Sequence, residues 1–125
     1  MILGIGLDII ETARVERALK NPRFMNRVYT AGEQEYIENR KGNVQSAAGI
    51  YAAKEAVSKA LGTGIGPISF QEVEIVWREN GKPSVKLTGN ALKLLQDMGG
   101  KRIMVSITHI KDLAAAQAVI DGGDR

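Results

Sequence analysis

The stretch that decides the fold spans residues 46–66 and reads SAAGIYAAKEAVSKALGTGIG. Most of it consists of alanine and other strong helix formers, and Ile50, Val57 and Leu61 recur at helical spacing. This pattern predicts a helix with one buried face. Gly62 stands where a left-handed C-cap is expected, so the helix should end near Leu61.

The polar residues of this helix, Lys54, Glu55, Ser58 and Lys59, gather on or beside the opposite face. One interpretation of Glu55 and Lys59 is an exposed ion pair one turn apart, worth about 0.3–0.5 kcal/mol. The other is functional, because an otherwise alanine-rich helix carries its charges in one compact group. The helix alone leaves both interpretations open.

The loop after the helix, residues 63–66, has the glycine content of a phosphate cradle. Its position argues against that role, because the C-terminal end of a helix dipole is negative and repels anions. We therefore interpret the loop as a helix stop. Any phosphate near this helix must be held by lysines and a metal.

The N-terminal run at residues 2–10, ILGIGLDII, predicts a central strand that Gly4 and Gly6 make thin on one side. Asp8 lies near its end. An ionised carboxylate in an apolar strand is unfavourable unless it is paired, hydrogen-bonded or bound to a metal. Capping of the backbone amides in the next turn is one explanation, and ligation of a hard divalent cation is the other.

With 125 residues, the chain suits one domain with a real core and is too short for two ordinary ones, so we expect a single domain over residues 1–125. No run approaches the about 20 apolar residues that span a bilayer. The absence of cysteine excludes disulfides and thiolate metal sites and suits a reducing cytoplasm. A metal must therefore bind oxygen or the single histidine, His109.

The net charge is only +3, but residues 14–27 carry a basic cluster in which Glu16 is the only acid. Such a cluster raises the local concentration of anionic partners and steers their approach, although a solvated helix face would look the same. The cluster comprises Arg14, Arg17, Lys20, Arg23 and Arg27.

Local patterns predict helices at residues 12–19, 30–39 and 88–98, with Thr12 as the first N-cap and a Thr30–Glu33 capping box in the second. They predict strands at residues 70–78, 83–87, 102–110 and 113–120, the first two joined by an Asn80-Gly81 hairpin turn. The fold class is therefore α+β, with a mixed or antiparallel sheet of about five strands packed by the central helix and three smaller ones.

Two carboxylates stand in suggestive settings, Asp8 at a strand end and Glu55 on the central helix. Two suffice for Mg²⁺, which keeps several waters and takes its other ligands from substrate phosphates. Lys59, one turn beyond Glu55, adds a cation that can reach a phosphate. Without an activated serine or cysteine nucleophile, this combination favours phosphoryl-type chemistry by positioning and charge neutralisation.

The sequence resembles the bacterial holo-[acyl-carrier-protein] synthases, members of the 4′-phosphopantetheinyl transferase family. The resemblance covers essentially the whole chain, and its specific signature pairs G-x-D near the start with KEA-x-x-KALGTG on the central helix. The motifs occur in the family's order and spacing as GIGLDII, RFMNRVYTAGEQEY, YAAKEAVSKALGTGIG, ENGKPSVKLTGNA and VSITHIKDLAAAQAVI.

This resemblance implies transfer of the 4′-phosphopantetheine arm from coenzyme A to a serine of an apo-acyl carrier protein, with release of adenosine 3′,5′-bisphosphate. By similarity, Asp8 and Glu55 hold Mg²⁺ against the coenzyme A pyrophosphate, and Lys59 neutralises charge on the leaving phosphate. These three are the expected catalytic residues. The resemblance leaves the general base open between a water at the metal and Glu55.

The resemblance also implies homotrimers with sites between protomers. The expected coenzyme A contacts are Lys54, Ser58, Thr63, Gly64 and His109, the last near the adenosine end and a subunit interface. Acidic carrier proteins dock in this family on the positions of Arg14 and Arg17, with Phe24 and Met25 as apolar contacts.

One position departs from the family. Arginine usually precedes the aromatic residue before AAKEA, and here Ile50 stands in its place. Either Arg40 or Lys41 in the preceding loop replaces that cationic contact to coenzyme A, or the affinity for coenzyme A is lower.

Two other classes of function are compatible with parts of the sequence. A non-catalytic basic module could bind nucleic acid through residues 14–27, but no nucleic-acid motif is present and aromatic residues make up only 5% of the chain. A Mg²⁺-dependent hydrolase of nucleotide pyrophosphates would use the same carboxylates without a protein acceptor.

Overall fold

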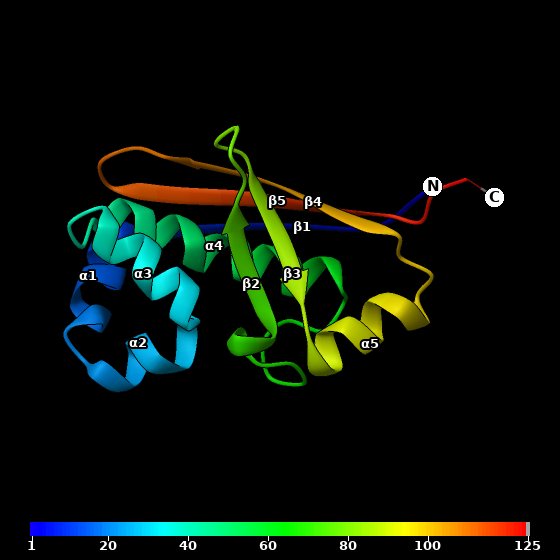
Figure 1. Cartoon of the computed structure of the whole chain (residues 1–125), viewed down its shortest axis with the longest axis horizontal. Coiled ribbons are helices and arrows are strands. Elements are labelled where there is room, and N and C mark those ends of the chain that lie inside the picture. Colours follow the sequence, from blue (N-terminus) through cyan, green and yellow to red (C-terminus); the bar gives the residue numbers. More distant parts are fainter. Residues whose placement is uncertain (125) are drawn as a thin grey trace.

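The computed structural model describes residues 1–124, and this part of the chain contains five strands, five α-helices and one 3₁₀ turn. In Figure 1 the strands β1, β4 and β5 run along one side of the molecule and the helices lie below them. The elements are β1 (Ile2–Glu11), α1 (Thr12–Leu19), α2 (Pro22–Val28), α3 (Ala31–Asn39), α4 (Val44–Ala60), η1 (Phe70–Glu72), β2 (Val73–Trp77), β3 (Pro83–Leu87), α5 (Gly89–Asp97), β4 (Arg102–His109) and β5 (Leu113–Asp121).

The predicted α+β class is confirmed, but the strands divide between two antiparallel sheets. One sheet has the order β1-β5-β4, and the other is the hairpin of β2 and β3. In the first sheet Gly6 pairs with Ala118 and Asp8 with Ala116. Both alanines are buried. Small residues thus line the face of the sheet against which α4 packs.

The two glycines of β1 let α4 lie directly on the strand. A Cβ atom at Gly6 would overlap the carbonyl oxygen of Ala56, and one at Gly4 would overlap that of Ala60. From Gly4 to Gly6, two residues along β1, the contact on α4 therefore moves back by one turn, from Ala60 to Ala56. Asp8, the next residue on this face, falls beside the turn of α4 that contains Glu55.

The outer face of the same strand is uncovered. Ile5, Leu7 and Ile9 alternate with the inward residues of β1, and they are 68%, 67% and 64% exposed. Met104 of β4 is also exposed. A row of large apolar side chains in solvent is typical of a surface that contacts another protein chain.

The β2–β3 hairpin turns at Asn80 and Gly81, as predicted, with Gly81 in the left-handed region at φ 82°. The predicted strand at residues 70–78 is shorter, because residues 70–72 form the turn η1. This turn places the Glu72 carboxylate over the start of α5, where it accepts hydrogen bonds from the amides of Asn90 and Ala91. Glu72 thus caps α5, and the expected cap Thr88 makes no side-chain cap hydrogen bond.

The first helices also differ in detail from the prediction. Thr12 is the first residue of α1, not its N-cap, and its hydroxyl donates to the Lys111 carbonyl at 2.8 Å. The Thr30–Glu33 capping box of α3 is confirmed. The helix α2 was not predicted, because its seven residues are too few for a periodic pattern. Pro22 at its first turn and Asn21 as N-cap are its only local signals.

The central helix α4 begins two residues earlier than predicted and is buried on most of its surface. Asn43 caps it by accepting a hydrogen bond from the Ser46 amide. Lys54 and Ser58, expected on the polar face, are fully buried. In the described residues 1–124, no helix is long and apolar enough to cross a membrane.

Candidate functional site

The strand β1 and the helix α4 bring Asp8 and Lys59 together. The Lys59 ammonium lies 3.2 Å from Asp8 Oδ1 and donates to the Leu7 carbonyl at 3.0 Å. Side-chain exposure is 48% for Lys59 and 16% for Asp8, so the pair opens to solvent. Close packing at Gly6 fixes this geometry, because it sets the distance between the strand and the helix.

Glu55 joins this pair from one turn earlier on α4. Burial raises the pKa of its carboxyl, and the negative charge of Asp8 raises it further. The Tyr51 hydroxyl and the Lys59 ammonium act in the opposite direction. Asp8, Glu55 and Lys59 therefore form one electrostatic unit, in which two acidic groups repel each other and share one cation.

This donor set fits a hard divalent cation. Residues 1–124 contain no group of three or more histidine, cysteine, aspartate or glutamate side chains that could enclose a metal. Asp8 and Glu55 alone offer two carboxylates whose mutual repulsion a cation would relieve. Mg²⁺ binds through one or two carboxylates and completes its shell with water and phosphate oxygens.

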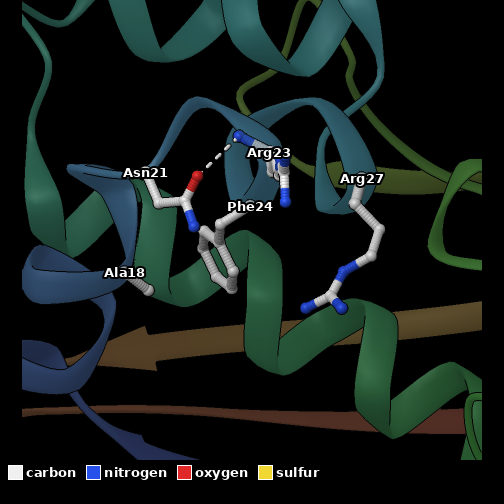
Figure 2. Close-up of a pocket in the computed structure, with 5 residues that line it drawn as sticks. All are labelled: Ala18, Asn21, Arg23, Phe24 and Arg27. Carbon is white, nitrogen blue, oxygen red and sulfur yellow. Dashed lines mark hydrogen bonds between the residues drawn. The ribbon is translucent and has the colours of Figure 1, made fainter.

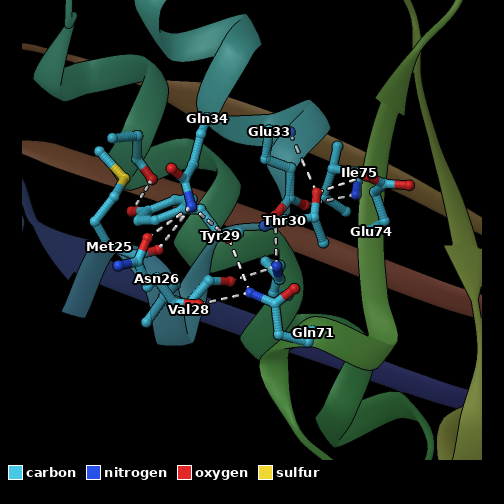
Figure 3. A network of polar contacts seen from close by, with 12 residues as sticks. Met25, Asn26, Val28, Tyr29, Thr30, Glu33, Gln34, Gln71, Glu74 and Ile75 are labelled. Carbon is cyan, nitrogen blue, oxygen red and sulfur yellow. Dashed lines mark hydrogen bonds and ion pairs between the residues drawn. The ribbon is translucent and has the colours of Figure 1, made fainter. Parts of the chain in front are cut away.

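Lys54 lies outside this site, contrary to the prediction. It is fully buried, and its ammonium donates to Glu33 Oε1 at 2.5 Å and to the Val28 carbonyl. Glu33 also accepts hydrogen bonds from the amides of Thr30 and Ile75 at 2.9 and 2.7 Å. Figure 3 shows this carboxylate between α3 and β2. The Lys54 ammonium therefore has its partners in the interior of the protein.

Ser58 is also unavailable as a binding group, because it is fully buried and its hydroxyl donates to the Glu55 carbonyl at 2.6 Å. The loop behind it behaves as the predicted helix stop. The amides of Thr63 and Gly64 both donate to the Ser58 carbonyl, at 3.2 and 3.1 Å. Thr63 and Gly64 are half-buried at the end of α4, where they can form the wall of a cleft.

His109 is the last residue of β4 and is exposed. It pairs with Ala114 of β5, which in turn pairs with Ile10 of β1. Neighbouring strands lie about 4.8 Å apart, so about 10 Å separates the backbone of His109 from β1. Within this protomer His109 is thus not part of the Asp8–Lys59 pair.

The basic cluster forms a surface on α1 and α2. Arg14 and Arg17 are exposed on α1. Phe24 is half-buried beside a hollow of about 430 Å³. Figure 2 shows this hollow with the side chains that line it, Ala18, Asn21, Arg23, Phe24 and Arg27. Apolar and cationic groups therefore meet on one surface, as expected for contact with an acidic protein.

Tyr51 joins this surface to the carboxylates, a role that sequence reasoning missed. Its ring stacks on Phe24 with centroids 6.0 Å apart, and it lies tilted against Phe70 with centroids 5.5 Å apart. The charges of Glu55 and Asp8 raise the pKa of its hydroxyl, after the larger effect of burial. The only sequence signal was an aromatic residue one turn before Glu55.

The position that departs from the family pattern, Ile50, is wholly buried. Its side chain belongs to the hydrophobic core, as do those of Ala47 and Ala53 on the same helix. Arg40 and Lys41 are exposed in the loop before the helix. Lys41 has a left-handed backbone, with φ 58°.

Residues 4–118 match the 4′-phosphopantetheinyl transferase superfamily. The chain belongs to this family. The holo-[acyl-carrier-protein] synthase of Alkaliphilus metalliredigens is 47% identical over 120 residues, which cover 95% of this chain and 98% of that protein. That of Ruminiclostridium cellulolyticum is 48% identical over 128 residues, which cover 99% and 96%.

Solved structures of the family share the fold. The holo-(acyl-carrier-protein) synthase of Bacillus anthracis, crystallised with CoA (3′,5′-ADP), has a TM-score of 0.83 and 38% sequence identity. The match covers 98% of this chain and 99% of that one. Family membership thus agrees with the resemblance in the motifs.

Proposed function

We infer that this protein is a holo-[acyl-carrier-protein] synthase, which transfers 4′-phosphopantetheine from coenzyme A to a serine of an apo-acyl carrier protein. The full-length similarity to synthases of this activity supports the assignment. The observation that carries it in this chain is the convergence of Asp8, Glu55 and Lys59. The nucleic-acid-binding and hydrolase alternatives receive no support from these relatives.

The reaction exchanges the phosphoanhydride bond of coenzyme A for a phosphodiester bond to the carrier. The serine oxygen of the carrier forms a bond to the phosphorus that bears the pantetheine arm. The bond from this phosphorus to the bridging oxygen of the pyrophosphate breaks, and adenosine 3′,5′-bisphosphate leaves with the electron pair. The serine proton must go to a base in the site, for which a water molecule and the Glu55 carboxylate are the two candidates.

Asp8 and Glu55 are the residues that would hold Mg²⁺. The ion would supply positive charge against the pyrophosphate of coenzyme A. Lys59 then acts from the exposed side of the same unit, where its ammonium can leave Asp8 and follow the charge that develops on the leaving phosphate.

The surface on α1 and α2 would receive the carrier protein. Arg14 and Arg17 attract an acidic partner, while Phe24, which lines the hollow, and the half-buried Met25 offer apolar contact area on α2. The stack of Phe24 on Tyr51 leads from this surface to Glu55. A carrier docked here would bring its serine to the side of α4 on which the phosphate group is bound.

The protein is also proposed to act as a homotrimer with sites between protomers. The uncovered row of Ile5, Leu7 and Ile9 on β1 supports this, because an apolar face of this kind suits a second copy of the chain. Coenzyme A would then contact Thr63 and Gly64 of one protomer and His109 of another. Light scattering should give three times the protomer mass, and a smaller species for Leu7→Lys; a monomeric wild type would rule the trimer out.

Mass spectrometry of the carrier protein tests the function directly. Purified protein is incubated with coenzyme A, Mg²⁺ and apo-carrier, and the carrier should gain the mass of one phosphopantetheine. Asp8→Ala and Glu55→Ala should abolish this gain, while Glu35→Ala, at an exposed glutamate of α3, should retain it. Full activity in either of the first two variants would overturn the site assignment.

A further inference from the structure

The helix α2 carries the Phe24 and Met25 side chains proposed to contact the carrier, yet it has only seven residues. Isolated helices shorter than about 12 residues are marginal in water, so α2 depends on tertiary contacts for its position. Asn21 caps its N-terminus by accepting a hydrogen bond from the Arg23 amide at 2.9 Å. Its C-terminal carbonyl groups need partners from elsewhere.

Three side chains supply those partners, and each comes from a different element. Gln34 belongs to α3, Gln71 to η1 and Lys54 to α4. We call these three residues the α2 clamp. Their bonds run from Gln34 Nε2 to the carbonyls of Tyr29 (3.0 Å) and Met25 (3.4 Å), from Gln71 Nε2 to those of Asn26 (2.8 Å) and Tyr29 (2.9 Å), and from Lys54 Nζ to that of Val28.

Figure 3 shows the amides of Gln34 and Gln71 pointing toward the last turn of α2. Both reach the Tyr29 carbonyl, which thus accepts two hydrogen bonds. The Tyr29 side chain is itself buried and donates to the Ala47 carbonyl at 2.8 Å. The end of α2 is therefore attached to α3, to η1 and to the catalytic helix α4.

The clamp has a second effect through charge. The C-terminal end of a helix dipole is negative, and Lys54 places an ammonium group there. Because the next residue of α4 is Glu55, the turn of α4 that carries a catalytic carboxylate is also the turn that anchors α2. Lys54 thus joins α2, which carries the docking side chains, directly to α4, which carries Glu55.

We propose that the α2 clamp fixes the orientation in which α2 presents its docking side chains, so that Gln34 and Gln71 are positioning residues for the acyl carrier protein. This proposal rests on the proposed function and deepens it. Neither glutamine lines the hollow beside Phe24. Their effect on transfer passes through the geometry of α2.

The two glutamines allow a clean test, whereas the buried Lys54 does not, because its loss would leave Glu33 unpaired. Gln71 is exposed and Gln34 half-buried. The variants Gln34→Met and Gln71→Met keep the length of the side chain and remove the donor. Gln96→Met on α5 is the matched control, because Gln96 is exposed and its side chain makes no hydrogen bond within residues 1–124.

Steady-state kinetics with coenzyme A, Mg²⁺ and apo-carrier should separate the two substrates. The KM for the carrier should rise roughly three- to tenfold in each clamp variant, as expected for the loss of one or two hydrogen bonds that hold the docking helix. The KM for coenzyme A should stay at the wild-type value, as should both constants in Gln96→Met. An unchanged KM for the carrier, or an equal rise for both substrates, would overturn the proposal.

Amide hydrogen exchange without the carrier separates positioning from direct contact. The amides of Met25 and Tyr29, which are bonded within α2 and its caps, should exchange faster in the clamp variants, and those of α4 should not. A raised KM for the carrier with unchanged exchange in α2 would mean that the glutamines touch the carrier and that the clamp idea is wrong. If the wild type transfers nothing, the proposed function fails; if it transfers and the variants match it, only the clamp fails.

Discussion

The helix α4 carries two lysine–carboxylate pairs that lie five residues apart in the sequence and differ in almost every physical respect. Lys54 and Glu33 are 2.5 Å apart with both side chains 0% exposed. Lys59 and Asp8 are 3.2 Å apart, and 48% and 16% exposed. The same two functional groups thus form an interior pair and an open pair on one helix.

The difference lies in how many of their hydrogen-bonding groups are already used. Glu33 accepts from Lys54 and from the amides of Thr30 and Ile75, and Lys54 also donates to Val28. In the interior such saturation is required, because an unsatisfied buried charge is strongly unfavourable. Lys59 instead keeps an exposed ammonium that can bind a further anion. Accessibility, not residue type, separates the structural charge from the one proposed for catalysis.

The largest expected effect breaks the interior pair. Lys54→Met should lower the free energy of unfolding by about 3–5 kcal/mol, because it leaves the Glu33 carboxylate buried without its cation. Chemical denaturation in urea measures this. The double variant Lys54→Met/Glu33→Gln removes both charges and should recover most of the loss. A single variant within about 1 kcal/mol of the wild type would show that the pair is not a structural requirement.

Breaking the open pair of Lys59 and Asp8 should lower activity and leave stability almost unchanged. Lys59→Met should lower kcat about a hundredfold, the size of effect seen when one group that stabilises transition-state charge is removed. Its free energy of unfolding should change by less than about 1 kcal/mol, because exposed ion pairs are weak. Lys93→Met is the control, since Lys93 forms another exposed pair at 3.2 Å, with Asp97 on α5. Normal turnover in Lys59→Met would remove Lys59 from the mechanism.

Lowering the pH should restore part of the stability that Lys54→Met loses. Burial raises the pKa of Glu33, and Lys54 opposes this rise, so Lys54→Met should raise it further. The folded variant then binds a proton more tightly than the unfolded chain. The contribution of Glu33 to stability is therefore greatest below the unfolded pKa of glutamate and is lost as the pH rises through the folded pKa.

Denaturation curves between pH 5 and pH 8 test this sign. The stability deficit of Lys54→Met relative to the wild type should shrink on acidification, by at most about 1.4 kcal/mol per pH unit within the window. The double variant Lys54→Met/Glu33→Gln has no carboxyl at this position and should show no such gain. A stability deficit that stays constant between pH 5 and pH 8 would mean that Lys54→Met does not leave the Glu33 carboxylate buried without a partner.

Most of the fold was predictable because its signals are local. The alanine-rich helix, the Thr30–Glu33 capping box and the Asn80-Gly81 turn each act through neighbouring residues. The division into two sheets was not, because strand pairing depends on contacts between distant residues. The helix α2 was missed because its seven residues form no periodic pattern and the partners of its C-terminus lie on α3, η1 and α4.

The site was predicted in part. Asp8, Glu55 and Lys59 do come together, and Gly6 opposite Ala56 explains why the strand and the helix approach so closely. Lys54 and Ser58 were placed on the polar face because a helical pattern treats every polar residue as solvent-facing. The partner that draws Lys54 inside, Glu33, lies on another helix, and no local pattern connects the two.

The smallest expected effect is that of ionic strength, which should weaken binding of the carrier through exposed charges and leave the buried Lys54–Glu33 pair unaffected. The KM for the carrier should rise several-fold between about 0.05 and 0.5 M salt, because exposed charges such as Arg14 and Arg17 are screened. The denaturation midpoint should change little over this range, because the shortest ion pair among residues 1–124 is buried and screened little by salt. Arg14→Gln/Arg17→Gln should start from a higher KM and show a flatter dependence on salt, while Lys93→Gln on α5 should keep the wild-type slope. If the KM for the carrier depended on salt equally in the wild type and in both variants, the carrier would not be steered by α1. Arg14 and Arg17 would then contribute no more to docking than Lys93 does.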